Sequence, residues 1–436
     1  MNLSLEELLK LDGEYIIRAW GGRAAEPVVV ARGEGVFLIS VDGKRYIDCS
    51  SGLFVMVVGH NPKKVIDAIT RQAQEVIQTS MRQTTIPAIM LAKKLAEITP
   101  GKLKKTFYTT GGAESNEFAL KFAKAYKQKY EVVALKGSYH GLTPGALAVT
   151  SSSRYRASNF GPLPGPVLRA PQPYCYRCPL RMEYPGCDLW CAKELENVIK
   201  GNGIEVVNQM NVAAVIVEPV QGAGGIIPPR EYLPEVRRIC DRNDVLLIVD
   251  EVQTGFGRTG RMFACEHWGV EPDIMTLAKG IGGGIPLGAV VCKEEIVANA
   301  FMGTTPTSAG NAVACAAGLA TIQTIEEENL CENAENMGKY FTERLLEEIP
   351  SKYVGEVRFL GLMGGLELVY DTKTKEPVDG KTMEKIKIKL AEKGVIVSTS
   401  GPLGNEFRIQ PPLIINKEEV DMVVKAFKEA IEEVMG

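Results

Sequence analysis

The 436-residue sequence lacks three features, each of which would place it in a particular class of protein. It has no basic excess, because 50 lysines and arginines face 53 aspartates and glutamates, so nothing marks a surface for nucleic-acid phosphates. No apolar run reaches the roughly 18 residues that a membrane-spanning helix needs. Residues 1–18 are acidic and helix-like, without the basic start and apolar middle of a signal peptide. We therefore expect a cytoplasmic protein that binds neither nucleic acid nor a membrane.

Apolar residues make up 45% of the chain, which is enough to bury a core, and the length allows one large domain plus a smaller one. Between residues 63 and 320, helical segments alternate with short apolar, β-branched runs. This alternation predicts an α/β domain with a mostly parallel sheet flanked by helices. The predicted strands are Thr106–Thr109, Val132–Leu135, Val212–Val217, Val245–Val249, Ile274–Leu277 and Ala289–Cys292.

The two ends of the chain show a different pattern. Residues 36–48 alternate around Asp42-Gly43, which predicts a β-hairpin. From residue 321 the pattern predicts a smaller α+β domain. Its expected elements are helices at 321–348, 381–393 and 417–434 and strands at 356–360, 363–369 and 395–399. We expect residues 1–62 to join this domain, with the large domain at 63–320 and the rest at 321–436.

Polar residues follow four of the predicted strands at the point where each strand ends. Ligands of open α/β sheets lie outside the carboxyl ends of the strands, so these residues predict one site at one edge of the sheet. They are Tyr139 and His140 after the second strand, Glu218 and Gln221 after the third, Asp250 to Gly255 after the fourth, and Lys279 after the fifth.

Two of these residues indicate the chemistry of the site. Lys279 lies between an apolar strand and the glycine-rich run 280–284, and a partly buried lysine can form a Schiff base with an aldehyde. Asp250 ends a buried strand, where a carboxylate is costly unless it is paired. A protonated pyridine nitrogen is a suitable partner, while a helix cap or a salt bridge is the structural alternative.

A glycine-rich turn follows the first predicted strand. The stretch from Thr109 to Asn116 includes Gly111-Gly112 and precedes a helix predicted at 117–129. Such a turn gathers backbone N–H groups at the positive end of a helix, which suits a phosphate, although a turn without a ligand has the same residues. Neither a GxGxxG motif at this helix nor a GxxxxGK[ST] motif is present, so dinucleotide and P-loop sites are not favoured.

Taken together, these motifs resemble those of the class III (ω-) aminotransferases, which use pyridoxal 5'-phosphate on the fold type I scaffold. They are Gly-Gly-Ala-Glu at 111–114, Tyr-His-Gly at 139–141, Glu-Pro-Val-Gln-Gly at 218–222, the stretch 250–260 and Ala-Lys-Gly at 278–280. The resemblance covers nearly the whole chain and implies a pyridoxal-phosphate-dependent transaminase.

The resemblance also implies a role for each matching residue. Lys279 would carry the cofactor as a Schiff base and move the substrate proton, and Asp250 would pair with the pyridine nitrogen. The residues implied around the cofactor are Val252 and Tyr139 on the two ring faces, Gln253 near the ring hydroxyl, Gly112 and Ala113 at the phosphate, Glu218 nearby, and His140 packed beside it.

Three further residues extend this implied site. Thr307 matches the threonine that reaches the phosphate from a neighbouring subunit, which implies a homodimer, or a tetramer built from it, with shared active sites. Arg408 matches the arginine that binds the substrate α-carboxylate, for which a guanidinium fork is well suited. Phe54 aligns with an aromatic pocket residue of amine–pyruvate transaminases, and a core aromatic is its alternative interpretation.

One departure from the family pattern bears on the substrate. Relatives that convert 4-aminobutyrate or ornithine usually carry a glutamate after Gln-Gly, where it covers the carboxylate-binding arginine, and this chain has Ala223 there. The departure argues against those two activities. It favours an ω-amino acid or amine donor and a keto acid acceptor of the pyruvate kind. An amino-acid racemase or epimerase on the same scaffold stays open, as do, less favoured, a decarboxylating relative and a non-catalytic ligand-binding protein.

Four of the ten cysteines lie in a short insertion at 171–192. Cys175, Cys178, Cys187 and Cys191 are close enough in sequence to bind zinc, to form disulfides, or to remain reduced. Their spacing is not that of a standard zinc finger, and the chemistry of the family needs no metal. The sequence therefore predicts no catalytic metal and leaves the state of these thiols open.

Overall fold

The computed structural model describes residues 3–17, 28–152, 160–201, 211–298 and 305–436. The chain forms two compact units, one of residues 63–332 and one that combines residues 1–62 with 333–436. The predicted boundary at residue 320 falls inside helix α10 (Ala312–Glu327). The single long helix predicted at 321–348 is instead two helices, α10 and α11 (Leu330–Glu348), because Asn329 between them has a positive φ of 53°.

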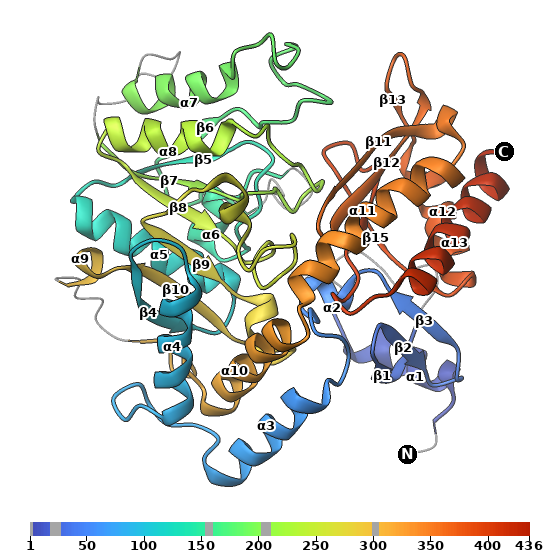
Figure 1. The fold of residues 1–436 in the computed structure, drawn as a ribbon, viewed down its shortest axis with the longest axis horizontal. Helices are drawn as coiled ribbons and strands as arrows, with labels where there is room; N and C mark the ends of the chain where they lie inside the picture. Colours follow the sequence, from blue (N-terminus) through green and yellow to red (C-terminus); the bar gives the residue numbers. More distant parts are fainter. Residues whose placement is uncertain (1–2, 18–27, 153–159, 202–210, 299–304) are drawn as a thin grey trace. The chain divides into compact units, whose positions relative to one another are not determined.

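The larger unit contains a seven-stranded sheet in the order β4-β10-β9-β8-β7-β5-β6 (Figure 1). All strands run in the same direction except β10, which is antiparallel to both of its neighbours. Their bounds are β4 (Leu103–Thr109), β5 (Glu131–Leu135), β6 (Val167–Ala170), β7 (Val212–Val217), β8 (Leu246–Asp250), β9 (Ile274–Leu277) and β10 (Gly288–Lys293). This sheet confirms the predicted α/β fold class.

The central strands are buried on both faces, which explains their nearly continuous apolar sequence. Every residue of β5, β7, β8 and β9 is buried. Alternate residues of these strands share one core cluster with the apolar side of helix α5 (Gly112–Lys127). The other helices of this unit are α3 (Lys63–Glu75), α4 (Ile86–Ile98), α6 (Pro144–Val149), α7 (Trp190–Lys200), α8 (Tyr232–Arg242) and α9 (Glu294–Val297), with single 3-10 turns at Ala264–Trp268 and Lys279–Gly282.

The smaller unit is α+β and is built from both ends of the chain. One sheet has the order β1-β2-β3-β14 and the other the order β11-β12-β16-β15, with β13 paired to β12. The strands are β1 (Val30–Glu34), β2 (Phe37–Ser40), β3 (Arg45–Asp48), β11 (Val354–Leu360), β12 (Met363–Asp371), β13 (Glu376–Pro377), β14 (Val395–Ile396), β15 (Ser398–Ser400) and β16 (Glu406–Ile409). The helical segments are α1 (Leu5–Tyr15), α2 (Ser51–Phe54), α12 (Gly380–Glu392), α13 (Lys417–Met435), a 3-10 turn at Ser351–Tyr353 and the part of α11 from Asn333 onward.

Within the described part of the chain, every helix is too short or too polar to cross a lipid bilayer.

Candidate active site

Lys279 follows β9 directly and starts a 3-10 turn with a positive φ of 49°. Its side chain is half-buried, and its Nζ donates a hydrogen bond of 2.8 Å to Oε1 of Gln253, which follows β8. Gly222, which follows β7, lets Gln253 come this close, because a Cβ at Gly222 would lie 2.6 Å from the same Oε1. The carboxyl ends of three neighbouring strands therefore meet at Lys279.

The carboxylate of Asp250, at the end of β8, is buried and accepts hydrogen bonds from distant parts of the sequence. Its Oδ2 lies 2.8 Å from Nδ2 of Asn116 and 2.7 Å from Nδ1 of His140. Its Oδ1 accepts a bond of 3.0 Å from the backbone N–H of Val252. Because an ionised carboxylate only accepts, the imidazole donates through Nδ1, and this contact fixes the orientation of the ring.

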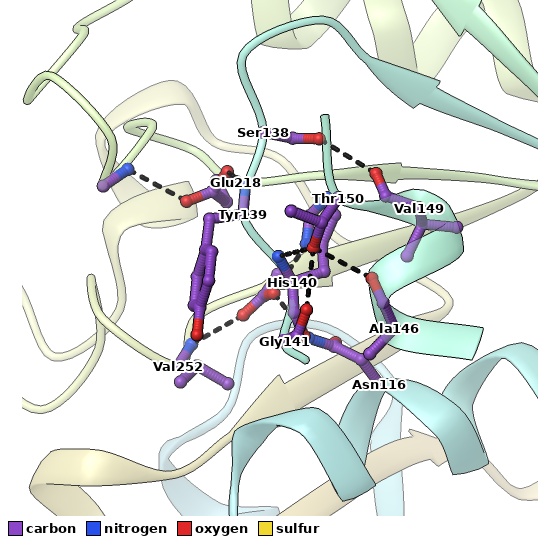
Figure 2. Close-up of polar contacts among 12 residues, drawn as sticks. Asn116, Ser138, Tyr139, His140, Gly141, Ala146, Val149, Thr150, Glu218 and Val252 are labelled. Carbon is purple, nitrogen blue, oxygen red and sulfur yellow. Dashed lines mark hydrogen bonds and ion pairs between the residues drawn. The ribbon is translucent and has the colours of Figure 1, made fainter. Parts of the chain in front are cut away.

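A second layer of contacts holds His140 in place (Figure 2). The Thr150 hydroxyl accepts from the backbone N–H of His140 at 2.9 Å, and Nδ2 of Asn116 also donates to the His140 carbonyl at 2.7 Å. Thr150 lies within hydrogen-bonding distance of the carbonyls of Gly141 and Ala146, so it ties the loop after β5 to α6. The Nε2 atom of His140 is buried and has no hydrogen-bond partner among the described residues.

Glu218, at the end of β7, joins two loops of the site. Its Oε2 accepts from the backbone N–H of Tyr139 at 2.9 Å, and its Oε1 accepts from the N–H of Gly222 at 2.9 Å. Burial raises the pKa of Glu218 to about 7, and the nearby Asp250 carboxylate adds to the rise, while the imidazole of His140 and the two N–H groups oppose it. A carboxyl group that can change its protonation near neutral pH therefore lies beside Asp250 and Tyr139.

The glycine-rich turn after β4 opens helix α5 five residues earlier than predicted, at Gly112 and not at 117. Gly111 occupies the N-cap position without a side-chain hydrogen bond, and a Cβ added there would meet no atom within 4 Å. A Cβ at Gly112 would lie 2.7 Å from Val252, so the start of the helix packs directly against the residue that follows β8. The N–H groups of Gly112 and Ala113 lie at the positive end of this helix.

Arg408 and Phe54 belong to the smaller unit, where they contact each other. Arg408 lies on β16, and its guanidinium carbon Cζ is 4.5 Å from the centroid of the Phe54 ring. Both side chains are largely buried. The sequence motifs point to the two residues separately and do not predict that they touch.

Thr307 lies in a turn just before α10, and its side chain is exposed. Its carbonyl accepts a bond of 3.2 Å from Nε2 of Gln78, whose Oε1 accepts from Asn311 at 2.8 Å. The turn is thus anchored through its backbone, and the threonine side chain is left at the surface.

The four cysteines of the insertion line a single cavity together with Tyr174, Tyr184 and Trp190. All ten cysteines lie in the described ranges, and none of them forms a disulfide. The described ranges also contain no group of three or more cysteine, histidine or acidic side chains arranged to hold a metal ion. Burial raises the pKa of Cys191 to about 12, with a smaller contribution from the three neighbouring cysteines. The four cysteines of the insertion therefore line one cavity and are not joined by disulfides.

Two residues of the site had no predicted role. Asn116 lies one turn into α5 and Thr150 just after α6, and each is fully buried with its hydrogen bonds directed at His140 or Asp250. For Asn116 the available signal was its place at the end of the glycine-rich stretch 109–116, and Thr150 lies in none of the motifs. That signal does not name the partner, since both partners are remote in sequence.

Comparisons with known proteins agree with the motifs. The model of the family described as "Aminotransferase class-III" matches residues 21–431. A 4-aminobutyrate aminotransferase of Mycobacterium bovis is 41% identical over 90% of this chain and 88% of its own length. A leucine/methionine racemase of Thermococcus litoralis is 39% identical over 94% and 93%. A solved (S)-enantioselective ω-transaminase from Thermomicrobium roseum superimposes with a TM-score of 0.92, at 34% identity over the whole of both chains.

Proposed function

The chain belongs to the class-III aminotransferases, enzymes that depend on pyridoxal phosphate, and from this premise we propose its reaction. The proposed donor is an ω-amino acid or an amine without an α-carboxylate, and the proposed acceptor is a keto acid of the pyruvate kind. The observation that supports this choice of substrates is Ala223, a buried residue with no charge to offer Arg408.

The residues of the larger unit fit the cofactor. Asp250 is a buried carboxylate held as an acceptor by Asn116 and His140, as a protonated pyridine nitrogen requires. The uncapped start of α5 at Gly112, with open space at Gly111, fits a phosphate group. Lys279, at the carboxyl end of β9, offers the amine. We infer that these residues hold the cofactor, with Tyr139 and Val252 against the ring, Gln253 near its hydroxyl, and Glu218 and His140 behind.

When bound, pyridoxal phosphate supplies an aldehyde that reacts with primary amines and a ring that takes up negative charge. Lys279 is the base proposed to remove and return the proton at the α-carbon of the substrate. Its bond to Gln253 aims Nζ at the edge of the sheet where the other residues of the site converge. Asp250 holds a fixed negative charge there, because its neighbours donate to it from three directions.

Arg408 is proposed to bind the carboxylate of the keto acid. A guanidinium group pairs with a carboxylate through two parallel N–H···O bonds, and the Phe54 ring keeps one face of the group dry. In relatives that convert 4-aminobutyrate or ornithine, a glutamate after Gln-Gly can cover the arginine. Ala223 cannot do so, which argues against those two donors.

A donor panel tests this proposal. The purified holoenzyme is given single amines and amino acids, each with pyruvate and separately with 2-oxoglutarate, and formation of the new amino acid is measured. We expect turnover with ω-amino acids or simple amines when pyruvate is present. Efficient turnover of 4-aminobutyrate with 2-oxoglutarate, and of nothing else, would contradict the proposed substrates and leave the family assignment unchanged.

A racemase is the second candidate, and the Thermococcus litoralis relative favours it. Moving the α-proton of an amino acid to the opposite face needs the same lysine and the same cofactor, with no keto acid. Incubation of one enantiomer of leucine or methionine without a keto acid separates the candidates. Formation of the other enantiomer supports the racemase, whereas turnover that depends on pyruvate supports the transaminase.

We also propose that the active enzyme is a homodimer in which Thr307 of one subunit reaches the phosphate held by the other. The exposed side chain of Thr307 and the backbone anchoring of its turn support this arrangement. The cytoplasmic location expected from the sequence stays a prediction.

A further inference from the structure

The backbone adopts the left-handed conformation in the segment that follows β3. Residues 51–54, which form α2, have φ values of 38°, 60°, 68° and 68°. Only Gly52 among them is a glycine. For an ordinary residue this region costs about 1–2 kcal/mol, so Ser51, Leu53 and Phe54 form an unfavourable turn unless other contacts hold it.

The buried carboxylate of Asp48 holds the turn at its start. Oδ1 accepts from the backbone N–H of Ser50 at 2.9 Å, and Oδ2 accepts from the N–H of Gly52 at 2.7 Å. These two N–H groups lie where the chain leaves β3 and enters the left-handed turn. One carboxylate therefore binds the backbone on both sides of Ser51.

His60 supports Asp48 from the far end of the same loop. Its Nε2 lies 3.1 Å from Oδ2 of Asp48, and both side chains are more than nine-tenths buried. The backbone of His60 is itself fixed by two hydrogen bonds to Gly35. Because the carboxylate only accepts, the imidazole donates through Nε2. The imidazole therefore supplies a third donor to the carboxylate that holds the turn.

The loop is also tied to the strands that flank Arg408. The N–H of Cys49 donates to the carbonyl of Ile396, and the carbonyl of Cys49 accepts from the N–H of Gln410. The hydroxyls of Ser50 and Ser398 lie 2.8 Å apart. The position of the turn is therefore fixed relative to β16, which carries Arg408. The turn ends at Phe54, whose ring lies over the guanidinium group.

We propose that Asp48 and His60 are positioning residues of the carboxylate pocket: they fix the left-handed turn 51–54 and thereby hold the Phe54 ring over Arg408. The inference rests on the proposed role of Arg408 in binding the substrate carboxylate. A strained turn kept by a buried three-donor carboxylate is hard to explain by packing alone, because an ordinary right-handed turn would spare the backbone this cost. The ring restricts the guanidinium group to one orientation and shields one of its faces from water.

Four variants of the holoenzyme test the proposal. Asp48→Asn replaces one carboxylate oxygen with an NH2 group, so at least one of the three groups that donate to Asp48 loses its acceptor. His60→Leu removes one of these three donors, the imidazole. His60→Gln keeps an amide N–H that can reach the carboxylate. Asp42→Asn is the matched control, because Asp42 makes the same kind of bond, to the N–H of Lys44, in the exposed turn between β2 and β3.

Two measurements distinguish a misplaced Arg408 from a general loss of folding or activity. The first is the dissociation constant of propionate, a carboxylate with no amino or keto group, followed through the absorbance of the bound cofactor. The second compares the KM for pyruvate with the rate of the half-reaction of isopropylamine, which has no carboxylate. Thermal unfolding of each variant is recorded alongside.

We expect Asp48→Asn and His60→Leu to raise both the dissociation constant of propionate and the KM for pyruvate by about fivefold or more. The reason is that the cation–π contact is lost and the guanidinium group is misplaced. The isopropylamine half-reaction should stay within about twofold, and His60→Gln and Asp42→Asn should bind propionate within about twofold of the wild type. Unchanged propionate binding in a folded Asp48→Asn protein would overturn the proposal, as would equal losses with both substrates.

If Asp48→Asn does not fold, the contrast between His60→Leu and His60→Gln decides, and equal behaviour of these two overturns the inference. The titration does not depend on turnover. If the wild-type enzyme transaminates no donor but its propionate binding falls in the variants, the proposed function fails and the positioning role stands. If the wild type does not bind propionate, the role of Arg408 fails and this inference fails with it.

Discussion

At the scale of single residues, Asp250 shows how a buried charge is made stable. Its carboxylate receives donors from α5, from the loop after β5 and from the backbone just after β8, which together offset the cost of burial. The sequence predicted the carboxylate and the histidine as members of one site, because both follow strands. It did not predict Asn116 as their common partner, because a buried polar residue inside a helix does not reveal which distant group it faces.

Lys279 carries the most direct residue-level prediction. Lys279→Ala should abolish turnover and the absorbance band of the lysine-bound cofactor, because Nζ is the amine that joins the cofactor and the base that moves the substrate proton. Activity assays and an absorbance spectrum of the purified variant check this. Lys136→Ala is the control, since Lys136 also follows a strand but its side chain is exposed. Normal turnover by Lys279→Ala would show that another residue does this work.

Glu218 should make stability depend on pH in an unusual direction. Burial raises its pKa in the folded protein to about 7 from the ordinary 4.5, so between these values the folded protein binds a proton that the unfolded chain has released. Its contribution to stability therefore falls as pH rises through this window, by up to about 3 kcal/mol. Above pH 7 both states are ionised and the contribution no longer changes.

The measurement compares the thermal unfolding of wild type and Glu218→Gln from pH 5 to 8. The wild type should lose stability relative to the variant as pH rises. The exposed Glu34→Gln serves as control and should run parallel to the wild type. A difference between wild type and Glu218→Gln that does not change with pH would show that Glu218 keeps an ordinary pKa in the folded protein.

At the scale of secondary-structure elements, the buried strands were the easiest to predict. The predicted bounds of β7 and β9 agree with the structure residue by residue, because a strand covered on both faces reads as an uninterrupted apolar run. Helix ends were harder. The start of α5 was placed too late because Gly112 and Ala113 read as part of a turn, and α10 and α11 were joined because the helical pattern continues through Asn329. The left-handed turn at 51–54 has no sequence signal, since three of its residues are not glycines.

Helix α11 makes an element-level prediction through Gly338. A Cβ at this position would lie 1.9 Å from the carbonyl oxygen of Gly361, in the turn between β11 and β12. Alanine usually stabilises a helix by about 0.5–1 kcal/mol over glycine, but here the methyl group overlaps a backbone atom that cannot rotate away. Gly338→Ala should therefore destabilise the smaller unit by about 3 kcal/mol or more, or prevent its folding.

Gly380, at the start of α12, supplies the matched control for this prediction. A Cβ there would meet no atom within 4 Å, so Gly380→Ala should be neutral or slightly stabilising. Chemical denaturation of the two variants measures the contrast. Equal stabilities would mean that α11 can move away from the β11–β12 turn at no cost.

At the scale of the whole molecule, the order of the strands accounts for part of the candidate site and leaves two of its proposed residues outside. Parallel strands end at one edge of a sheet, so the residues that follow four of the strands were expected to lie together. The hydrogen bonds between Tyr139 and Glu218, between Lys279 and Gln253, and between His140 and Asp250 agree with this expectation. Arg408 and Thr307 do not follow from it. The first lies in the smaller unit, and the second is an exposed residue whose proposed target is in another copy of the chain.

Mixing two inactive variants tests whether subunits share their sites. In a homodimer of Lys279→Ala every site lacks the lysine. In a homodimer of Thr307→Glu every site would bring a negative charge to the phosphate.

If Thr307 acts across the interface, a mixed dimer has one site with both defects and one site with the native Lys279 and the native Thr307. Random pairing of equal amounts makes half of the dimers mixed, so about a quarter of the wild-type activity should return after the subunits exchange. If each site were built from one chain, every site would keep one defect, and mixing would restore no activity. The subunit exchange itself is followed with an affinity tag on one variant, and the activity is measured on the mixed dimers that carry it.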